Sequence, residues 1–284
     1  MSVRRRGVDF YRLGAYILII IFMVFAIIPV YWMLITAFKT PADTREFKFL
    51  PFIDFQPVLD TWMDILIGSL SEQTLKAIRN GLIIASGAAT LSVVLGSLAG
   101  YALARFRYRR WKNRDIASFI LAQRMMPPAV VLLPIFMFFS ILKLIDTHVA
   151  LILIEAAVNM PFAIWILMDF FREVPREVEE AAYLDGLTIA QTFYRISLRI
   201  ALPGIVVAWI LTFIFSWNEF LFVLALAYSE TITLPWLIST GFSMRALEYW
   251  TISVFGTLAI IPPTILAFLI QRYIIRGMAL GAVK

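Results

Sequence analysis

Four polar residues inside long apolar stretches are the first candidates for chemistry: Arg124, Glu155, Asn159 and Glu219. Charged and amide side chains are costly at membrane depth, so they usually face a cavity or a partner. Glu155 and Asn159 are four positions apart, which places them on one face of a helix. Carboxylates and amides suit a hydroxyl-rich ligand. The alternative is that Arg124 pairs with Glu155 or Glu219 and only holds helices together.

The same stretches supply three further candidates for a substrate path: Gln123, Trp217 and Asn218. An aromatic ring suits the apolar face of a sugar. Pro127 and Pro128 are expected to break the helix just beyond Arg124, which would free backbone carbonyls to line a cavity.

Other chemistry has little support in the composition. The chain has no cysteine, which excludes thiol ligands and disulfides, and its one histidine is His148, so no metal site is expected. No set of nucleophile, base and orienting residue is apparent, which argues against an enzyme. The net charge of +6 comes from basic residues beside apolar segments, so nucleic-acid binding is not expected.

The elements that must position these residues are membrane helices. Hydrophobic residues make up 61% of the 284 residues and charged residues 15%, which is far from a soluble composition. Six apolar segments are each long enough to cross a bilayer: 14–37, 80–104, 116–142, 149–171, 203–227 and 252–275. We therefore predict an all-α integral membrane protein with six transmembrane helices. The first segment is too long for a signal-peptide core and is expected to remain as an anchor.

The distribution of Lys and Arg predicts the orientation. Four regions are basic, namely the N-tail (1–13), the link 105–115, the link 172–202 and the C-tail (276–284). All four fall on one side of a six-span protein, and positive loops face the cytoplasm. Both termini are thus expected inside. The 38–79 link offsets its basic residues with acids and is predicted to be extracytoplasmic, and the core comprises 80–275.

The link 172–202 has the pattern of a helix, a break and a second helix. Pro175 suits a helix start and Gly186 suits a left-handed helix end. Thr188 and Gln191 have the spacing of a capping box that begins a second helix. Between the ends lie Ala181 and Ala182, whose small side chains would let another protein approach closely. The alternative is an ordinary amphipathic linker at the membrane surface.

This stretch, "EEAAYLDGLTIAQTFYRISLRIALP", closely resembles the EAA loop of ABC importer permeases. Further motifs resemble the carbohydrate-importing, maltose-type branch, in its six-span subunit: "NGLIIASGAATLSVVLGSLAGYALARF", "QRMMPP", "NMPFAIWIL", "SWNEF" and "QRYIIRGMALGAVK". The likeness covers nearly the whole chain from residue 14 to residue 284. One departure is Arg199, where the family usually has proline; Pro203 remains.

The resemblance implies a type I importer permease fold in a bacterial inner membrane. It implies a second permease subunit, two ATPase subunits that bind ATP and Mg, and an extracytoplasmic solute-binding protein. The chain itself has no phosphate-binding loop, so no cofactor is expected on it. By resemblance, five residues of the loop would contact the ATPase: Glu180, Ala181, Ala182, Asp185 and Gly186.

The expected cargo is a sugar, a polyol or a glycerol-like solute. Segments 38–79 and 228–251 are candidates for docking the binding protein. The competing hypothesis is an ion-gradient-driven secondary transporter that uses Arg124, Glu155 and Glu219 as a relay. That hypothesis leaves the link 172–202 unexplained.

Overall fold

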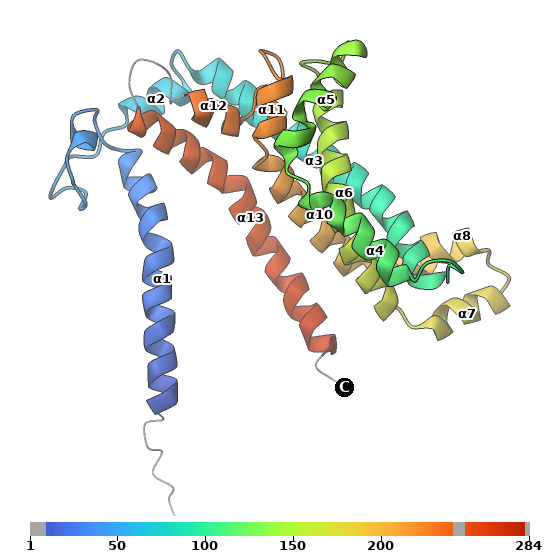
Figure 1. Cartoon of the computed structure of the whole chain (residues 1–284). Helices are drawn as coiled ribbons and strands as arrows, with labels where there is room; N and C mark the ends of the chain where they lie inside the picture. The colour runs from blue at the N-terminus through green and yellow to red at the C-terminus, as the bar shows by residue number, and fades with distance from the viewer. Residues whose placement is uncertain (1–9, 241–247, 282–284) are drawn as a thin grey trace, which may run out of the picture. The chain divides into compact units, whose positions relative to one another are not determined.

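The computed structural model describes residues 10–240 and 248–281, and every regular element among them is helical (Figure 1). An isolated bridge between Pro51 and Phe55 is the one β-type pairing in that part of the chain. The predictions made for the first nine residues, for the last three and for the 241–247 part of the second docking segment lie outside the described residues.

The chain divides into two compact units. The first comprises residues 1–71 and 238–258, and its helices before the boundary are α1 (Phe10–Thr36), η1 (Asp43–Arg45) and α2 (Asp60–Leu66). The second comprises residues 72–237 and 259–284. Its elements up to the inner link are α3 (Ser71–Arg105), α4 (Asn113–Ala122), η2 (Gln123–Met125), α5 (Pro128–Ile141) and α6 (His148–Glu173).

The second half of the chain continues the larger unit. It contains α7 (Arg176–Leu184), α8 (Ile189–Thr192), the π-helical turn η3 (Phe193–Ser197), α9 (Leu198–Ile200), α10 (Leu202–Trp217) and α11 (Leu221–Leu226). The last two helices, α12 (Leu234–Thr240) and α13 (Tyr249–Gly281), each cross the boundary between the units.

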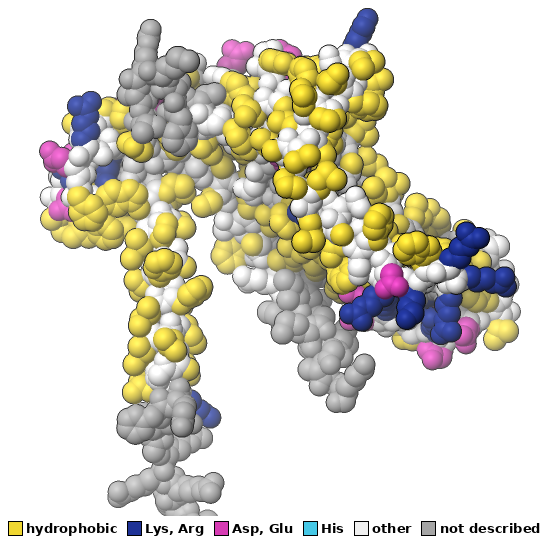
Figure 2. All heavy atoms as spheres, in the orientation of Figure 1, with side chains coloured by type: hydrophobic (Ala, Val, Ile, Leu, Met, Phe, Trp, Pro, Cys, Tyr) yellow, Lys and Arg dark blue, Asp and Glu magenta, His cyan; other side chains and the backbone are white. Residues whose placement is uncertain are grey.

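Four helices are long and apolar enough to span a membrane: Arg12–Thr36, Ser71–Arg105, His148–Glu173 and Tyr249–Gln271. Two bent pairs also qualify, Asn113–Met125 with Pro128–Ile141 at 84° and Ile189–Ile200 with Leu202–Trp217 at 76°. The structure thus has up to six spans, in agreement with the predicted all-α membrane fold. Hydrophobic side chains cover the face of α1 seen in Figure 2, as expected for a helix surrounded by lipid.

The core of the larger unit is built around α6, which packs against α3 and α10. A Cβ atom placed on Gly100 would lie 2.9 Å from the backbone nitrogen of Met168, so the backbones of α3 and α6 nearly touch. Ser92 on α3 donates a hydrogen bond of 3.0 Å to the carbonyl of Ala156 on α6. Small residues and hydroxyl groups at a helix contact are the usual way to pack helices in lipid.

Two helices differ in extent from the predicted apolar segments. The segment 203–227 is not one helix, because α10 ends at Trp217 and α11 begins at Leu221. The carboxylate of Glu219 accepts hydrogen bonds from the backbone N–H groups of Leu221 and Phe222, each at 2.9 Å, which stabilises the new helix start. The helix α3 begins nine residues before the predicted residue 80, since two polar turns precede the apolar ones.

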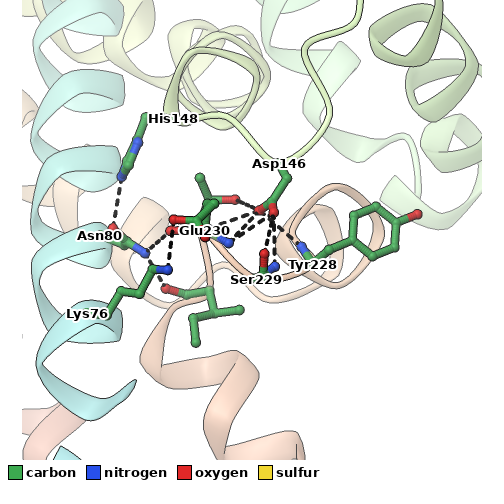
Figure 3. A network of polar contacts seen from close by, with 9 residues as sticks. Lys76, Asn80, Asp146, His148, Tyr228, Ser229 and Glu230 are labelled. Atoms are coloured by element: carbon green, nitrogen blue, oxygen red, sulfur yellow. Dashed lines mark hydrogen bonds and ion pairs between the residues drawn. The ribbon is translucent and has the colours of Figure 1, made fainter. Parts of the chain in front are cut away.

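Asp146 joins the α5–α6 turn to the segment after α11 (Figure 3). Its carboxylate accepts hydrogen bonds from the backbone N–H groups of Tyr228, Ser229, Glu230 and Thr231. Burial opposes ionisation of this carboxyl, but these donors and the Thr231 hydroxyl outweigh it and hold its pKa below the ordinary value. The same segment is tied to α3, where Asn80 donates to the carbonyls of Glu230 and Ile232.

The 38–79 link is partly folded within the first unit. The Lys39 side chain is buried, donates to the carbonyl of Lys48 at 2.7 Å and lies 4.0 Å from the ring centre of Trp32. Tyr31 and Trp32 also pack against Phe49. Aromatic and polar contacts within the first unit therefore hold this part of the link in place, and its role in docking stays a prediction.

Candidate functional sites

The link between α6 and α10 folds as a helical hairpin made of α7 and the run α8–η3–α9. The helix α7 ends at Leu184, and Gly186 follows two residues later with φ of +86°. The Gly186 N–H donates to the carbonyl of Tyr183, and the Leu187 N–H donates to that of Ala182, both at 3.0 Å. These two bonds form a Schellman motif, so the predicted glycine-terminated helix is confirmed.

The second arm begins with the predicted capping box. The Thr188 hydroxyl accepts from the Gln191 N–H, and the Gln191 side chain accepts from the Thr188 N–H. The arm then passes through the π-turn Phe193–Ser197 and bends at Ala201 by 76° relative to α10. The bend is thus present with Arg199 in place of proline.

A buried ion pair fastens this hairpin to α3. The guanidinium of Arg105 lies 2.6 Å from one carboxylate oxygen of Glu179, and the Ser197 hydroxyl donates to the other oxygen at 2.6 Å. Arg105 also donates to the carbonyl of Val174 at 2.7 Å. One carboxylate therefore joins the end of α3 to both arms. Sequence reasoning missed Glu179, because nothing in the chain order distinguishes it from its neighbour Glu180.

Four of the five residues expected to contact the ATPase are exposed: Glu180, Ala181, Asp185 and Gly186. The fifth, Ala182, is 4% exposed and packs inside the chain. The prediction of an open patch made by both alanines was therefore wrong in this respect. The two alanines lie on different faces of α7, so only Ala181 offers a small-residue surface to another protein.

Four of the seven candidate path residues line one cavity of about 130 Å³, namely Arg124, Glu155, Asn159 and Glu219. They come from the α4–α5 bend, from α6 and from the α10–α11 break. The predicted break after Arg124 is confirmed, since α4 and α5 meet at 84° across Met126 and Pro127. The two breaks and α6 together build a polar pocket within an apolar bundle.

Inside this cavity Arg124 is held by an amide and an aromatic ring. Its guanidinium donates to the Asn159 side-chain oxygen at 3.1 Å and lies 4.3 Å from the ring centre of Phe215. Among the described side chains, no ion pair joins Arg124 to Glu155 or Glu219. The expected alternative of a purely structural ion pair was wrong, and the cation keeps donors free for another group.

Glu155 is the most deeply buried acid of the cavity, at 1% exposure. One of its oxygens accepts a hydrogen bond from the Ser216 hydroxyl, and the other has no hydrogen-bond partner within the described structure. A buried acceptor without a partner is costly, and such groups often mark functional sites.

The remaining three candidates do not line the cavity. Gln123 is exposed, and its amide nitrogen lies 3.4 Å from the Phe119 carbonyl. Trp217 is 3% exposed, donates to the Ala259 carbonyl and packs against Gly81. Asn218 donates to the Ile214 carbonyl at the end of α10. Trp217 thus contacts α3 and α13, and Asn218 is bonded within its own helix.

Comparison with known proteins places this arrangement in a class. The profile of the family "Binding-protein-dependent transport system inner membrane component" matches residues 92–280. The chain belongs to this family and is a permease subunit of an ABC importer.

Two relatives are similar along most of their length. The trehalose transport system permease protein SugB of Mycobacterium tuberculosis is 33% identical over 92% of this chain and 93% of its own. The diacetylchitobiose uptake system permease protein DasC of Streptomyces coelicolor is 33% identical over 91% of this chain and 92% of its own.

The fold agrees with this assignment. A crystal structure of a bacterial ABC transporter involved in alginate import superposes with a TM-score of 0.75 at 19% identity, covering 96% of this chain and 99% of the matched chain. The chain therefore has the type I importer permease fold that its resemblance implied.

Proposed function

We propose that this chain is the six-span permease of a carbohydrate or polyol importer, which couples solute passage to a separate ATPase through the α7–α8 hairpin. The observation that carries the proposal is the fastening of the hairpin to α3 through Arg105 and Glu179. An external protein that pulls on the exposed side of α7 would move α3 and the hairpin together. Rigid-body motion of this kind switches the accessible side of a transport cavity.

The complete transporter would contain a second permease, two ATPase subunits that bind ATP and Mg, and an extracytoplasmic solute-binding protein. Relatives named for trehalose and diacetylchitobiose support a carbohydrate cargo. A cavity with a guanidinium, an amide, a carboxylate and an aromatic ring is suited to hydroxyl groups and to the apolar face of a sugar. Both termini would lie in the cytoplasm, and the hairpin with them.

The absence of cysteine from the chain allows a direct test. Ala181→Cys places a single thiol on the exposed side of α7, and Ala42→Cys places one on the exposed part of the predicted extracytoplasmic link. With the ATPase subunits present, the thiol at position 181 should cross-link to an ATPase and the thiol at position 42 should not. A membrane-impermeant thiol reagent should label intact cells only at position 42. Labelling of position 181 from outside, or no cross-link to the ATPase, would contradict the proposal.

A transport assay separates this function from an ion-driven transporter. Uptake into vesicles that requires ATP and survives an uncoupler supports the importer. Uptake that is abolished by the uncoupler and is indifferent to ATP would support the gradient-driven alternative.

A further inference from the structure

A second, larger cavity lies where α3 and α6 end beside the start of α7. Its volume is about 340 Å³, within the size range of small-molecule sites. Five cationic residues line it: Arg105, Arg107, Lys112, Arg172 and Arg176. No Asp or Glu is among its lining residues. The transport function assigns no role to this cavity.

Most of this positive charge is not neutralised by the protein. Arg105 is paired with Glu179, and Arg172 lies 3.1 Å from the carboxylate of Asp169. The ion pairs found among the described residues do not include Arg107, Lys112 or Arg176. Lys and Arg side chains gather at the end of the larger unit where α7 and α8 lie, as Figure 2 shows. Three or more cations that converge on one concave surface favour an anionic ligand.

Hydrogen bonds hold the wall of the cavity in place. The side-chain amide of Asn113, at the start of α4, donates to the carbonyls of Leu103 and Phe106 near the end of α3. These bonds hold the connection between α3 and α4 in a fixed conformation. Arg105 donates to the Val174 carbonyl and so links the end of α3 to the start of the hairpin. The site is therefore formed without a ligand.

The depth of the cavity in the membrane indicates the kind of anion. The apolar spans α3 and α6 end at Arg105 and Glu173, so the cavity lies at the level where hydrocarbon gives way to water. Exposed aromatic residues follow at once, with Tyr108 at 48% and Trp111 at 65% exposure. Aromatic rings of this kind lie among lipid headgroups, and basic pockets at helix ends bind anionic headgroups.

We propose that this cavity binds the phosphate group of an anionic phospholipid. The phosphate would be held by Arg107, Lys112 and Arg176, and the acyl chains would lie along the apolar surface of the bundle. Because Arg176 is the first residue of α7, an occupied site would anchor the hairpin to the membrane surface. The inference goes beyond the transport function, since none of the three cations is among the residues expected to contact the ATPase.

The test compares two triple variants of the full-length chain, purified with the subunits that accompany it. Arg107→Gln, Lys112→Gln and Arg176→Gln remove the cavity charges. Arg109→Gln, Arg110→Gln and Arg114→Gln remove the same charge from exposed residues that do not line the cavity. Native mass spectrometry would measure binding of phosphatidylglycerol, with phosphatidylcholine of the same chains as the neutral probe.

The wild type and the second variant should bind phosphatidylglycerol equally, and the cavity variant should bind it at least about tenfold more weakly. Equal losses in both variants, or no loss in either, would overturn the proposal. So would competition by inorganic phosphate at equal concentration, which would assign the site to a free phosphate. Loss of the ATPase from the cavity variant with lipid binding unchanged would make the surface a protein contact instead.

A second measurement needs no variant and covers the case in which the cavity variant does not fold. A photoreactive phosphatidylglycerol, with its reactive group near the phosphate, should attach to residues 103–113 or 172–176 of the wild-type chain. Attachment confined to other residues would overturn the proposal.

Discussion

The guanidinium of Arg105 and the carboxylate of Glu179 lie 2.6 Å apart, with side-chain exposures of 8% and 4%. The pair joins the last residue of α3 to the middle of α7, and Ser197 completes it from the second arm of the hairpin. A buried pair of this kind contributes little over an apolar contact, but removal of one partner leaves an uncompensated charge. The pair therefore fixes the position of the hairpin relative to α3.

We expect Glu179→Gln to destabilise the chain by about 3–5 kcal/mol, because it leaves the Arg105 guanidinium buried without a counter-charge. Glu180→Gln is the matched control, since it changes the neighbouring exposed carboxylate in the same way. Thermal unfolding of the purified variants would measure the difference. If both variants unfold at the temperature of the wild type, the ion pair does not hold the hairpin.

Replacement of Gly186 tests the turn between the arms. A Cβ atom here would meet nothing within 4 Å, so the cost of a side chain is backbone strain at φ of +86° rather than a clash. Gly186→Val should cost about 1–2 kcal/mol, whereas Gly186→Asn should cost less, since Asn tolerates the left-handed region. We expect the Val variant to be inserted but to lose stimulation of the ATPase. Wild-type ATPase coupling in Gly186→Val would argue against the hairpin as the coupling element.

Local sequence signals predicted those features of the hairpin and the cavity that depend only on residues close together in the chain. Gly186, the Thr188–Gln191 capping box and the break at Pro127 each act within a few residues, and the structure has all three. The burial of Ala182 on α7 depends on how that helix is rotated against α8 and η3, which helix periodicity alone does not fix.

For the same reason, the sequence could not show which of two neighbouring glutamates is buried. Glu179 and Glu180 are adjacent residues with the same side chain, and they differ in their distant partners, since Arg105 and Ser197 contact Glu179. The break after Trp217 was also missed, because the apolar run continues through it and the interrupting Glu219 was interpreted as part of a substrate path.

Asp146 should make stability depend on pH. Its pKa is lowered in the folded chain by the backbone donors of residues 228–231, so its contribution is fully present above the unfolded value of about 3.9. The contribution is lost as the pH falls below that value toward the lower folded pKa. Asp146→Asn retains an acceptor and suits the residue's φ of +58°, but presents an amide N–H to the backbone donors. It should lower the melting temperature at pH 7.

The difference between the wild type and Asp146→Asn should stay constant from neutrality down to about pH 4 and shrink below it, because the Asp146 carboxyl of the unfolded chain then takes up a proton before that of the folded chain does. Melting curves of both proteins in detergent across this range would show it. A difference that stays constant with pH would mean that the charge of Asp146 does not stabilise the loop network of Figure 3.

The cavity around Glu155 yields the last prediction. The Glu155 oxygen without a hydrogen-bond partner and the free donors of Arg124 line one cavity, with no ion pair between the two side chains. A hydroxyl group of the solute could donate to Glu155 and accept from Arg124. Glu155→Gln keeps the size of the side chain but replaces one of its oxygens with an amide group that only donates, and should reduce uptake about tenfold, as the loss of one hydrogen bond to the solute would. Trp217→Phe is the control, because it removes a polar group that lies outside the cavity. If Glu155→Gln assembles and transports like the wild type while its ATPase remains coupled, the solute path does not pass this carboxylate.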